Sequence, residues 1–235
     1  MQRVYSPTIL NGNSATISDP EIAHRLFSVM RLKSGDQFFV FDDSGAEFLA
    51  EITIIDKRRV SIGFVKNITK DVESTVKVKL YPALFKKQRF EWMLEKCTEL
   101  GVAEFNPIAS AHSTVQDNKD SGAQDRWKKI IISAVEQSER ITIPIIDHAQ
   151  TLEEALKSAY GKILVAAERV TGTEPWPELN AGDDVCLFIG PEGGWSAEEL
   201  ELFKSVGAIF LSFGKRILRA ETACIAGATL LLTNK

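Results

Sequence analysis

Cysteine and histidine are both scarce in this chain, with three residues of each type among 235. Cys97, Cys186 and Cys224 are far apart and fall in sequence patterns typical of a helix, a strand and a helix. Such an odd and scattered set argues against a disulfide framework or a zinc site, and it predicts buried, reduced thiols. The histidines also lack the spacing of metal ligands, so we expect no metal.

Long apolar runs and a signal peptide are missing as well. No stretch is apolar for long enough to span a bilayer, and the N-terminus has no hydrophobic signal segment. We therefore expect a cytoplasmic protein with no membrane partner. The net charge of −4 is not typical of a nucleic-acid-binding protein. The positive charges are nevertheless clustered, and a local basic face can still bind phosphates.

The sequence pattern changes at a polar, aperiodic segment near residue 72, so we expect a domain boundary there. The first part, residues 1–72, reads as mostly β, and short strands separated by turns predict a small barrel. Its strand patterns lie at residues 37–42, 47–55 and 59–65. A short helix is predicted at residues 19–29, and we expect His24 within it to lie on the surface or to be a packing partner, without a catalytic role.

In the second part, residues 73–235, strand and helix patterns alternate, which predicts a parallel sheet with helices on both faces. The strand patterns lie at residues 76–81, 102–108, 162–167, 185–190 and 208–213. The helix patterns lie at residues 90–100, 125–138, 151–159, 197–206 and 221–232. Ligands bind such sheets beyond the carboxyl ends of the strands, so the loops at 190–196 and 214–220 are the candidate site.

The first of these loops is rich in glycine and opens directly into a helix. Gly190, Gly193 and Gly194 follow an apolar strand, and Ser196 with Glu199 forms a capping box. A strand, a glycine loop and a helix N-terminus together direct backbone N–H groups at one point, which suits a strongly accepting ligand group. Glycines also let a ligand lie against bare backbone. The alternative is an ordinary strand-to-helix turn.

The two loops together resemble those of a known family. Residues 190–194 read Gly-Pro-Glu-Gly-Gly and residues 216–223 read Arg-Ile-Leu-Arg-Ala-Glu-Thr-Ala. This pair resembles the RsmE family, the 16S rRNA (uracil-N3)-methyltransferases of the SPOUT class. Further similar segments lie at residues 24–36, 95–102 and 126–144, so the resemblance spans nearly the whole chain.

The chain departs from the family pattern at two places. The family usually has Ser-Glu-Arg-Ser after the second strand of its α/β domain, whereas this chain has Ala111 and His112 between the two serines. Phe213 stands where the family usually has leucine, before Gly214.

The resemblance implies a fold of two domains. A PUA-like, RNA-binding β-barrel (residues 1–72) would precede a SPOUT α/β domain (residues 73–235) with a C-terminal trefoil knot. It also implies S-adenosylmethionine as methyl donor and a specific uridine of 16S rRNA, within the small ribosomal subunit, as the substrate. Finally, it implies a homodimer whose active site uses both subunits.

On this basis we expect the backbone of residues 190–194 and 211–218 to form the cofactor pocket. The cofactor-binding candidates are Ile189, Gly190, Glu192, Gly193, Gly194, Leu211, Ser212, Phe213, Gly214, Arg216, Ile217 and Leu218. RNA would be bound by cationic side chains, which position a nucleic acid without specifying its sequence. These candidates are Arg3, Arg25, Arg31, Lys33, Lys86, Lys87 and Arg89.

Methylation at N3 requires an unpaired or extruded base and loss of the N3 proton. Arg219 is the candidate that would stabilise the uracil anion, and its alternative role is an ion pair with Glu221. Glu192 or Glu221 could accept the proton, and Glu192 could instead accept hydrogen bonds from the loop amides. The residues do not decide between the two as general base.

Three other functions are alternatives. The same fold could methylate the ribose 2′-oxygen of RNA, or it could serve as a non-catalytic RNA-binding or ribosome-assembly factor. A phosphate or nucleotide enzyme is disfavoured, because no Walker lysine follows Gly194 and no dinucleotide-binding fingerprint is present.

Overall fold

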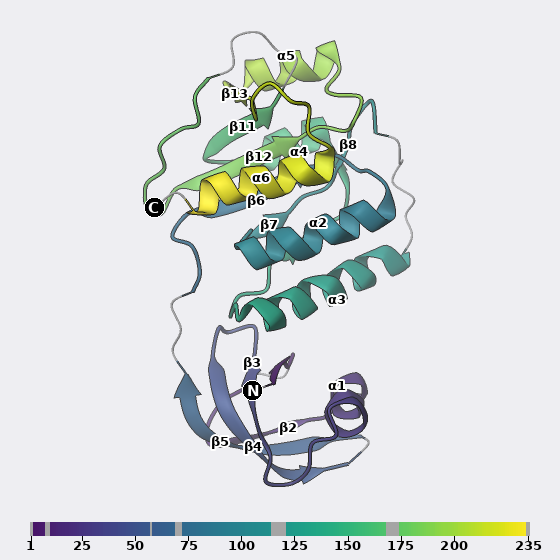
Figure 1. Cartoon of the computed structure of the whole chain (residues 1–235), viewed down its shortest axis with the longest axis vertical. Coiled ribbons are helices and arrows are strands. Elements are labelled where there is room, and N and C mark those ends of the chain that lie inside the picture. Colours follow the sequence, from purple (N-terminus) through teal and green to yellow (C-terminus); the bar gives the residue numbers. More distant parts are fainter. Residues whose placement is uncertain are drawn as a thin grey trace. The chain divides into compact units, whose positions relative to one another are not determined.

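The computed structural model describes residues 2–7, 10–56, 58–68, 72–113, 121–167 and 174–233 (Figure 1). The chain forms two compact units. Unit 1 comprises Met1–Glu73 and Val135–Ile143, and unit 2 comprises Ser74–Ala134 and Pro144–Lys235. A sequence division after residue 72 therefore leaves out residues 135–143, which cluster with unit 1.

Unit 1 contains a five-stranded sheet with the strand order β1-β3-β4-β5-β2. The strands are β1 (Arg3–Tyr5), β2 (Ser14–Ile17), β3 (Gln37–Phe41), β4 (Glu47–Ile55) and β5 (Val60–Ile68). β1 pairs with β3 in parallel and the other neighbours are antiparallel. Register shifts at Leu49/Ala50 and Ile52/Ile54 interrupt the β4–β5 ladder, and such bulges bend a sheet. The predicted strands are confirmed, and they form a curled sheet.

The short helix of unit 1 begins where the sequence predicts it. Asp19 caps α1 (Pro20–His24) by accepting hydrogen bonds from two backbone N–H groups, and Pro20 occupies the first turn, where its missing N–H costs nothing. The helix continues as a π-helix, η1 (Arg25–Val29). Leu26 and Ala23 enter the core, whereas His24 is exposed, which is one of its two expected positions.

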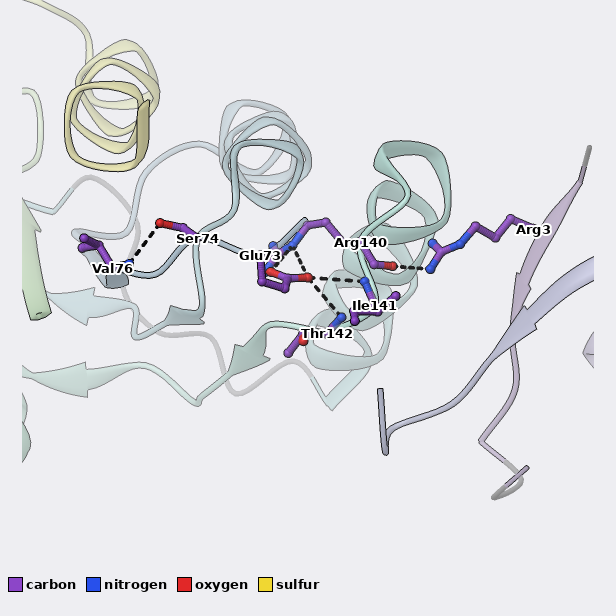
Figure 2. Close-up of polar contacts among 7 residues, drawn as sticks. All are labelled: Arg3, Glu73, Ser74, Val76, Arg140, Ile141 and Thr142. Carbon is purple, nitrogen blue, oxygen red and sulfur yellow. Dashed lines mark hydrogen bonds and ion pairs between the residues drawn. The ribbon is translucent and has the colours of Figure 1, made fainter. Parts of the chain in front are cut away.

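Two buried arginines join the separate segments of unit 1 (Figure 2). Arg3 forms an ion pair with Glu47 and donates hydrogen bonds to the carbonyl oxygens of Val135, at 2.9 Å, and Arg140. Arg140 in turn pairs with Glu73 at 2.8 Å. Arg3 is therefore not free to bind phosphates, and its predicted role in RNA binding is withdrawn.

The core of unit 2 is a six-stranded parallel sheet with the order β13-β11-β12-β6-β7-β9. Its strands are β6 (Lys77–Pro82), β7 (Glu104–Phe105), β9 (Ile145–Ile146), β11 (Lys162–Ala166), β12 (Asp184–Ile189) and β13 (Ile209–Leu211). β8 (Ile108–Ala109) and β10 (Gln150–Thr151) form a separate parallel pair. The single strand predicted at 102–108 is wrong, because Pro107 has no N–H for a ladder and the chain changes partner there.

Five helices accompany this sheet in the described part of the chain. They are α2 (Lys87–Leu100), α3 (Ser121–Ser138), α4 (Leu152–Ser158), α5 (Ala197–Ser205) and α6 (Ala220–Thr233). The capping boxes that open α4 and α5 are confirmed. α3 begins four residues earlier than its apolar pattern predicts, and its last four residues belong to unit 1.

The helices cover both faces of the parallel sheet, as predicted. Residues of α4 and α5, including Leu152 and Phe203, share a core cluster with Cys186 and Phe188 of β12. Leu187, which points to the opposite face of the strand, lies against Gly227 of α6. α6 runs beside α2 on this second face (Figure 1).

No helix in the described ranges has the length and apolar character needed to cross a bilayer. Within the same ranges, no three histidine, cysteine, aspartate or glutamate side chains cluster as metal ligands would.

Candidate active site

The two loops singled out from the sequence meet at one cavity of unit 2. The cavity has a volume of about 150 Å³ and lies at the carboxyl ends of β11 and β12. It is lined by Ala166, Ala167, Ile189, Gly190, Pro191, Glu192, Gly193, Gly194, Trp195, Leu200, Ile217, Leu218, Ala220 and Ala223. This position is the one expected for a ligand of a parallel α/β sheet.

The structure brings some of the predicted cofactor-binding residues to this wall and leaves others away from it. Ile189, Gly190, Glu192, Gly193, Gly194, Ile217 and Leu218 line the cavity, whereas Leu211, Ser212, Phe213, Gly214 and Arg216 do not. Leu211 is a buried partner of Ala166 in the sheet. Phe213 packs against Trp176, with ring centroids 5.2 Å apart. Ser212 and Gly214 hydrogen-bond to each other and shape the second loop.

Several wall residues were not predicted. Ala166 is the last residue of β11 and Ala167 follows it. β11 becomes a neighbour of β12 only through the strand order of the sheet. Trp195 lies within the glycine loop itself, and its Nε1 donates a hydrogen bond of 3.1 Å to the Ala166 carbonyl oxygen. That indole ring therefore connects the glycine loop to the neighbouring strand. Its position in the motif was a signal that could have identified it.

The chain's own packing accounts for the glycines of the first loop. A Cβ on Gly190 would lie 3.1 Å from the Trp195 ring, and a Cβ on Gly193 would lie 2.9 Å from the Cβ of His112. Gly194 has a φ of 75°, which is unfavourable for other residues. These glycines are thus required for the loop to adopt its shape, whether or not a ligand approaches it.

A second segment, residues 110–113, is fastened to the same loop. Nδ1 of His112 lies 3.1 Å from the Gly194 carbonyl oxygen. The backbone N–H of Ala111 donates to Oε1 of Glu199 at 3.0 Å, while Oε2 of Glu199 accepts from Ser196 N–H in the capping box. Glu199 therefore holds both the helix start and this neighbouring segment.

The electrostatic environment of the α5 N-terminus favours anionic side chains. The pKa of Glu198 is lowered by its own backbone N–H, by the Ser196 hydroxyl group and by the nearby His112. This shift is the one expected for a carboxylate at the positive end of a helix.

Arg89 connects the two candidate general bases. Its Nη1 lies 3.4 Å from Oε1 of Glu192, and its Nε lies 3.6 Å from Oε1 of Glu221. Glu221 is buried, with 6% of its surface exposed, whereas Glu192 is exposed at the cavity. Glu221 thus pairs with Arg89 and not with Arg219, which is exposed.

The remaining candidates for RNA binding lie on the surface of their own units. In unit 1, Arg25 is half-exposed and pairs with Glu136 at 2.6 Å, while Arg31 and Lys33 are exposed. In unit 2, Lys86 and Lys87 are exposed where α2 begins.

Comparisons with protein families give one consistent result. A family model described as an RNA methyltransferase domain matches residues 72–232, and one described as an RNA methyltransferase PUA domain matches residues 17–65. The chain is 30% identical to ribosomal RNA small subunit methyltransferase E of Bacillus subtilis, over 86% of this chain and 84% of that protein. It is 31% identical to the protein of the same name from Rickettsia conorii, over 94% and 92%.

Solved structures agree with these matches. A ribosomal RNA small subunit methyltransferase E from Neisseria gonorrhoeae, bound to S-adenosylmethionine, superposes with a TM-score of 0.88 at 28% identity and covers 99% of this chain and 97% of its own. A methyltransferase from Legionella pneumophila in complex with the same cofactor superposes with a TM-score of 0.86 at 31% identity, covering 98% and 96%.

Proposed function

The chain belongs to the ribosomal RNA small subunit methyltransferase E family, and on that premise we propose that it methylates N3 of a specific uridine in 16S rRNA. Family membership makes it an S-adenosylmethionine-dependent rRNA methyltransferase with a PUA domain and an α/β methyltransferase domain. The proposal is supported most directly by the cavity, because the loops after β12 and β13, which contain the two family motifs, both line its wall.

The residues around this cavity fit S-adenosylmethionine. Ile189, Leu218 and the Trp195 ring offer apolar surface for an adenine, and apolar walls with few polar groups are typical of cofactor sites. The Glu192 carboxylate on the wall suits a cationic ligand. Beside it, Oε2 of Glu221 is buried and has no hydrogen-bond partner among the described residues. When bound, this cofactor supplies an electrophilic methyl group.

The chain's own residues would prepare the uracil for transfer. We assign Glu192 as the acceptor of the N3 proton, because it is exposed at the cavity whereas Glu221 is buried. Arg219 follows the cavity residue Leu218, and its guanidinium would stabilise the negative charge that develops on the uracil. Glu192 would take the N3 proton, and N3 would then accept the methyl group that the bound cofactor supplies.

The substrate would be held by surface cations. Arg25, Arg31 and Lys33 of unit 1 and Lys86 and Lys87 of unit 2 are accessible for phosphate contacts. Contacts of this kind release counterions, so RNA affinity should fall steeply as salt concentration rises.

The finer features of the fold belong to the same proposal. We place the PUA-like barrel in residues 1–72 and the SPOUT domain in residues 73–235, with a trefoil knot near the C-terminus. The loop after β13 returns to the cavity that the loop after β12 forms, and this arrangement supports the knot.

The proposal also includes a homodimer. Trp92 on α2 and Leu230 on α6 are 47% and 38% exposed, and large exposed apolar residues on adjacent helices support such an interface. We propose a cytoplasmic location because the proposed substrate is the small ribosomal subunit.

The test is methyl transfer from isotopically labelled S-adenosylmethionine to small ribosomal subunits that lack the modification. Digestion to nucleosides should place the label in 3-methyluridine. Label in a ribose-methylated nucleoside would favour 2′-O-methylation, and cofactor binding without any transfer would favour a non-catalytic RNA-binding factor.

A further inference from the structure

Arg89 lies between two carboxylates from distant parts of unit 2. It is in the first turn of α2, Glu192 is in the loop after β12, and Glu221 is in the first turn of α6. The guanidinium is 3.4 Å from one carboxylate and 3.6 Å from the other. One side chain therefore joins a helix start to both loops of the candidate active site.

Local helix energetics do not account for an arginine at this position. α2 begins with Lys86, Lys87 and Arg89, its first turn contains no acidic residue, and its N-cap side chain accepts no hydrogen bond. Cations at this end oppose the helix dipole. The two carboxylates offset that disadvantage for Arg89. A residue that breaks a local rule and is compensated beside a ligand cavity indicates a role in function.

The cluster of Arg89, Glu192 and Glu221 carries excess negative charge, because one guanidinium faces two carboxylates. Glu221 is buried, so water screens its charge poorly. S-adenosylmethionine has one net positive charge at neutral pH, since its sulfonium and ammonium groups outnumber its carboxylate. The demethylated product, S-adenosylhomocysteine, has lost the sulfonium charge and is neutral.

We infer that this three-residue cluster favours the sulfonium cofactor over its demethylated product, and that Arg89 sets the strength of the preference. Arg89 is then a positioning residue that acts through Glu192 and Glu221, and not one of the RNA-binding cations. The preference helps the neutral product leave before the next cofactor binds. This inference rests on the proposed function, because it assigns the cavity to that cofactor.

Calorimetric titration of the full-length protein with each compound tests the inference. Glu192→Gln makes the cluster neutral and should lower the ratio of affinities, S-adenosylmethionine over S-adenosylhomocysteine, by about fivefold. Arg89→Gln makes the cluster more negative and should raise the same ratio by about fivefold. Both shifts should shrink at high salt, since part of the cluster is exposed.

Matched variants separate the effect of the cluster's charge on this ratio from unspecific effects of a substitution. Arg89→Lys keeps the charge and should leave the ratio unchanged, as should Glu153→Gln, which neutralises an exposed glutamate of α4 away from the cavity wall. Thermal unfolding of each variant is measured, because Arg89→Gln leaves Glu221 buried without its ion pair. Glu192→Gln, whose side chain is partly exposed, decides the matter if Arg89→Gln does not fold.

The outcomes are distinguishable. If the wild-type protein binds neither compound, the proposed function fails together with the inference. If it binds both and the ratio is the same in Glu192→Gln, or moves the same way in Glu192→Gln and Arg89→Gln, the inference alone is overturned.

Discussion

The imidazole Nδ1 of His112 lies 3.1 Å from the carbonyl oxygen of Gly194, and the His112 Cβ occupies the space beside Gly193. His112 does not line the cavity, whereas both glycines do. The shape of the cavity wall therefore depends on a residue behind it.

Replacing Gly193 with alanine should lower the affinity for S-adenosylmethionine by more than about tenfold. The new Cβ would lie 2.9 Å from that of His112, which real contacts do not reach, so the loop must move. Adding His112→Gly to the same chain removes the obstacle and should restore part of the affinity, as measured by calorimetry. Gly63→Ala is the control, because its Cβ would meet only Thr53 at 3.8 Å. Unchanged binding by Gly193→Ala would show that the two residues do not constrain the loop.

Arg219→Ala should reduce kcat by roughly 10²-fold while the cofactor Kd changes by less than about twofold. The reason is that the guanidinium is exposed beside the cavity and is proposed to act only on the charge that develops in the uracil. Single-turnover methylation of small subunits and a separate cofactor titration give the two values. Lys215→Ala, an exposed cation of the same loop, is the control. A loss confined to Kd would contradict the assignment.

Arg31→Gly should make the protein more stable and a weaker RNA binder. Arg31 has a φ of 56°, a left-handed conformation that closes the end of η1 and that glycine adopts without strain. We expect the free energy of unfolding to rise by about 1 kcal/mol, measured by denaturant titration. RNA affinity should fall because a surface cation is lost. Arg31→Ala should lose RNA affinity without gaining stability, and equal RNA affinity in all three proteins would remove Arg31 from the binding surface.

None of the three cysteines should react with a thiol reagent until the protein unfolds. Cys97, Cys186 and Cys224 are all buried, and burial raises the pKa of each thiol, so the reactive thiolate is disfavoured. The pKa of Cys224 is raised further by the neighbouring Cys97 and Glu221. Titration with a chromogenic disulfide, with and without denaturant, counts the accessible thiols. A thiol that reacts in the native state would place that cysteine nearer to solvent than the structure does.

Local sequence patterns predict most of the elements because local chemistry determines them. The capping boxes at Thr151 and Ser196 begin helices where the pattern places them, and the turn before Glu47 separates two predicted strands. Gly101 ends α2 with a φ of 105°, as a glycine C-cap should. Both loops of the candidate site were likewise identified, since each follows directly from a strand.

Features that depend on tertiary contacts were not accessible in the same way. Ala166 reaches the cavity only because β11 is inserted between β12 and β13 in the sheet. In the sequence Arg89 is one of a group of cations, and its carboxylate partners lie more than a hundred residues away. Arg3 was misassigned for the same reason, since the carbonyl groups that bind it come from the end of α3 and the residues after it.

The contacts of Arg3 with these carbonyl groups also affect the order in which the chain can fold during synthesis. The ribosome releases the strands of unit 1 first, yet Arg3 needs the carbonyl group of Val135. Arg3 and Glu73 both also need Arg140 (Figure 2). Until synthesis has passed residue 140, the Arg3 guanidinium can pair with Glu47 but lacks the two carbonyl groups that bind it in the folded protein. By then all of residues 74–134 have been translated, so unit 1 can be completed only after the first segment of unit 2 has been made.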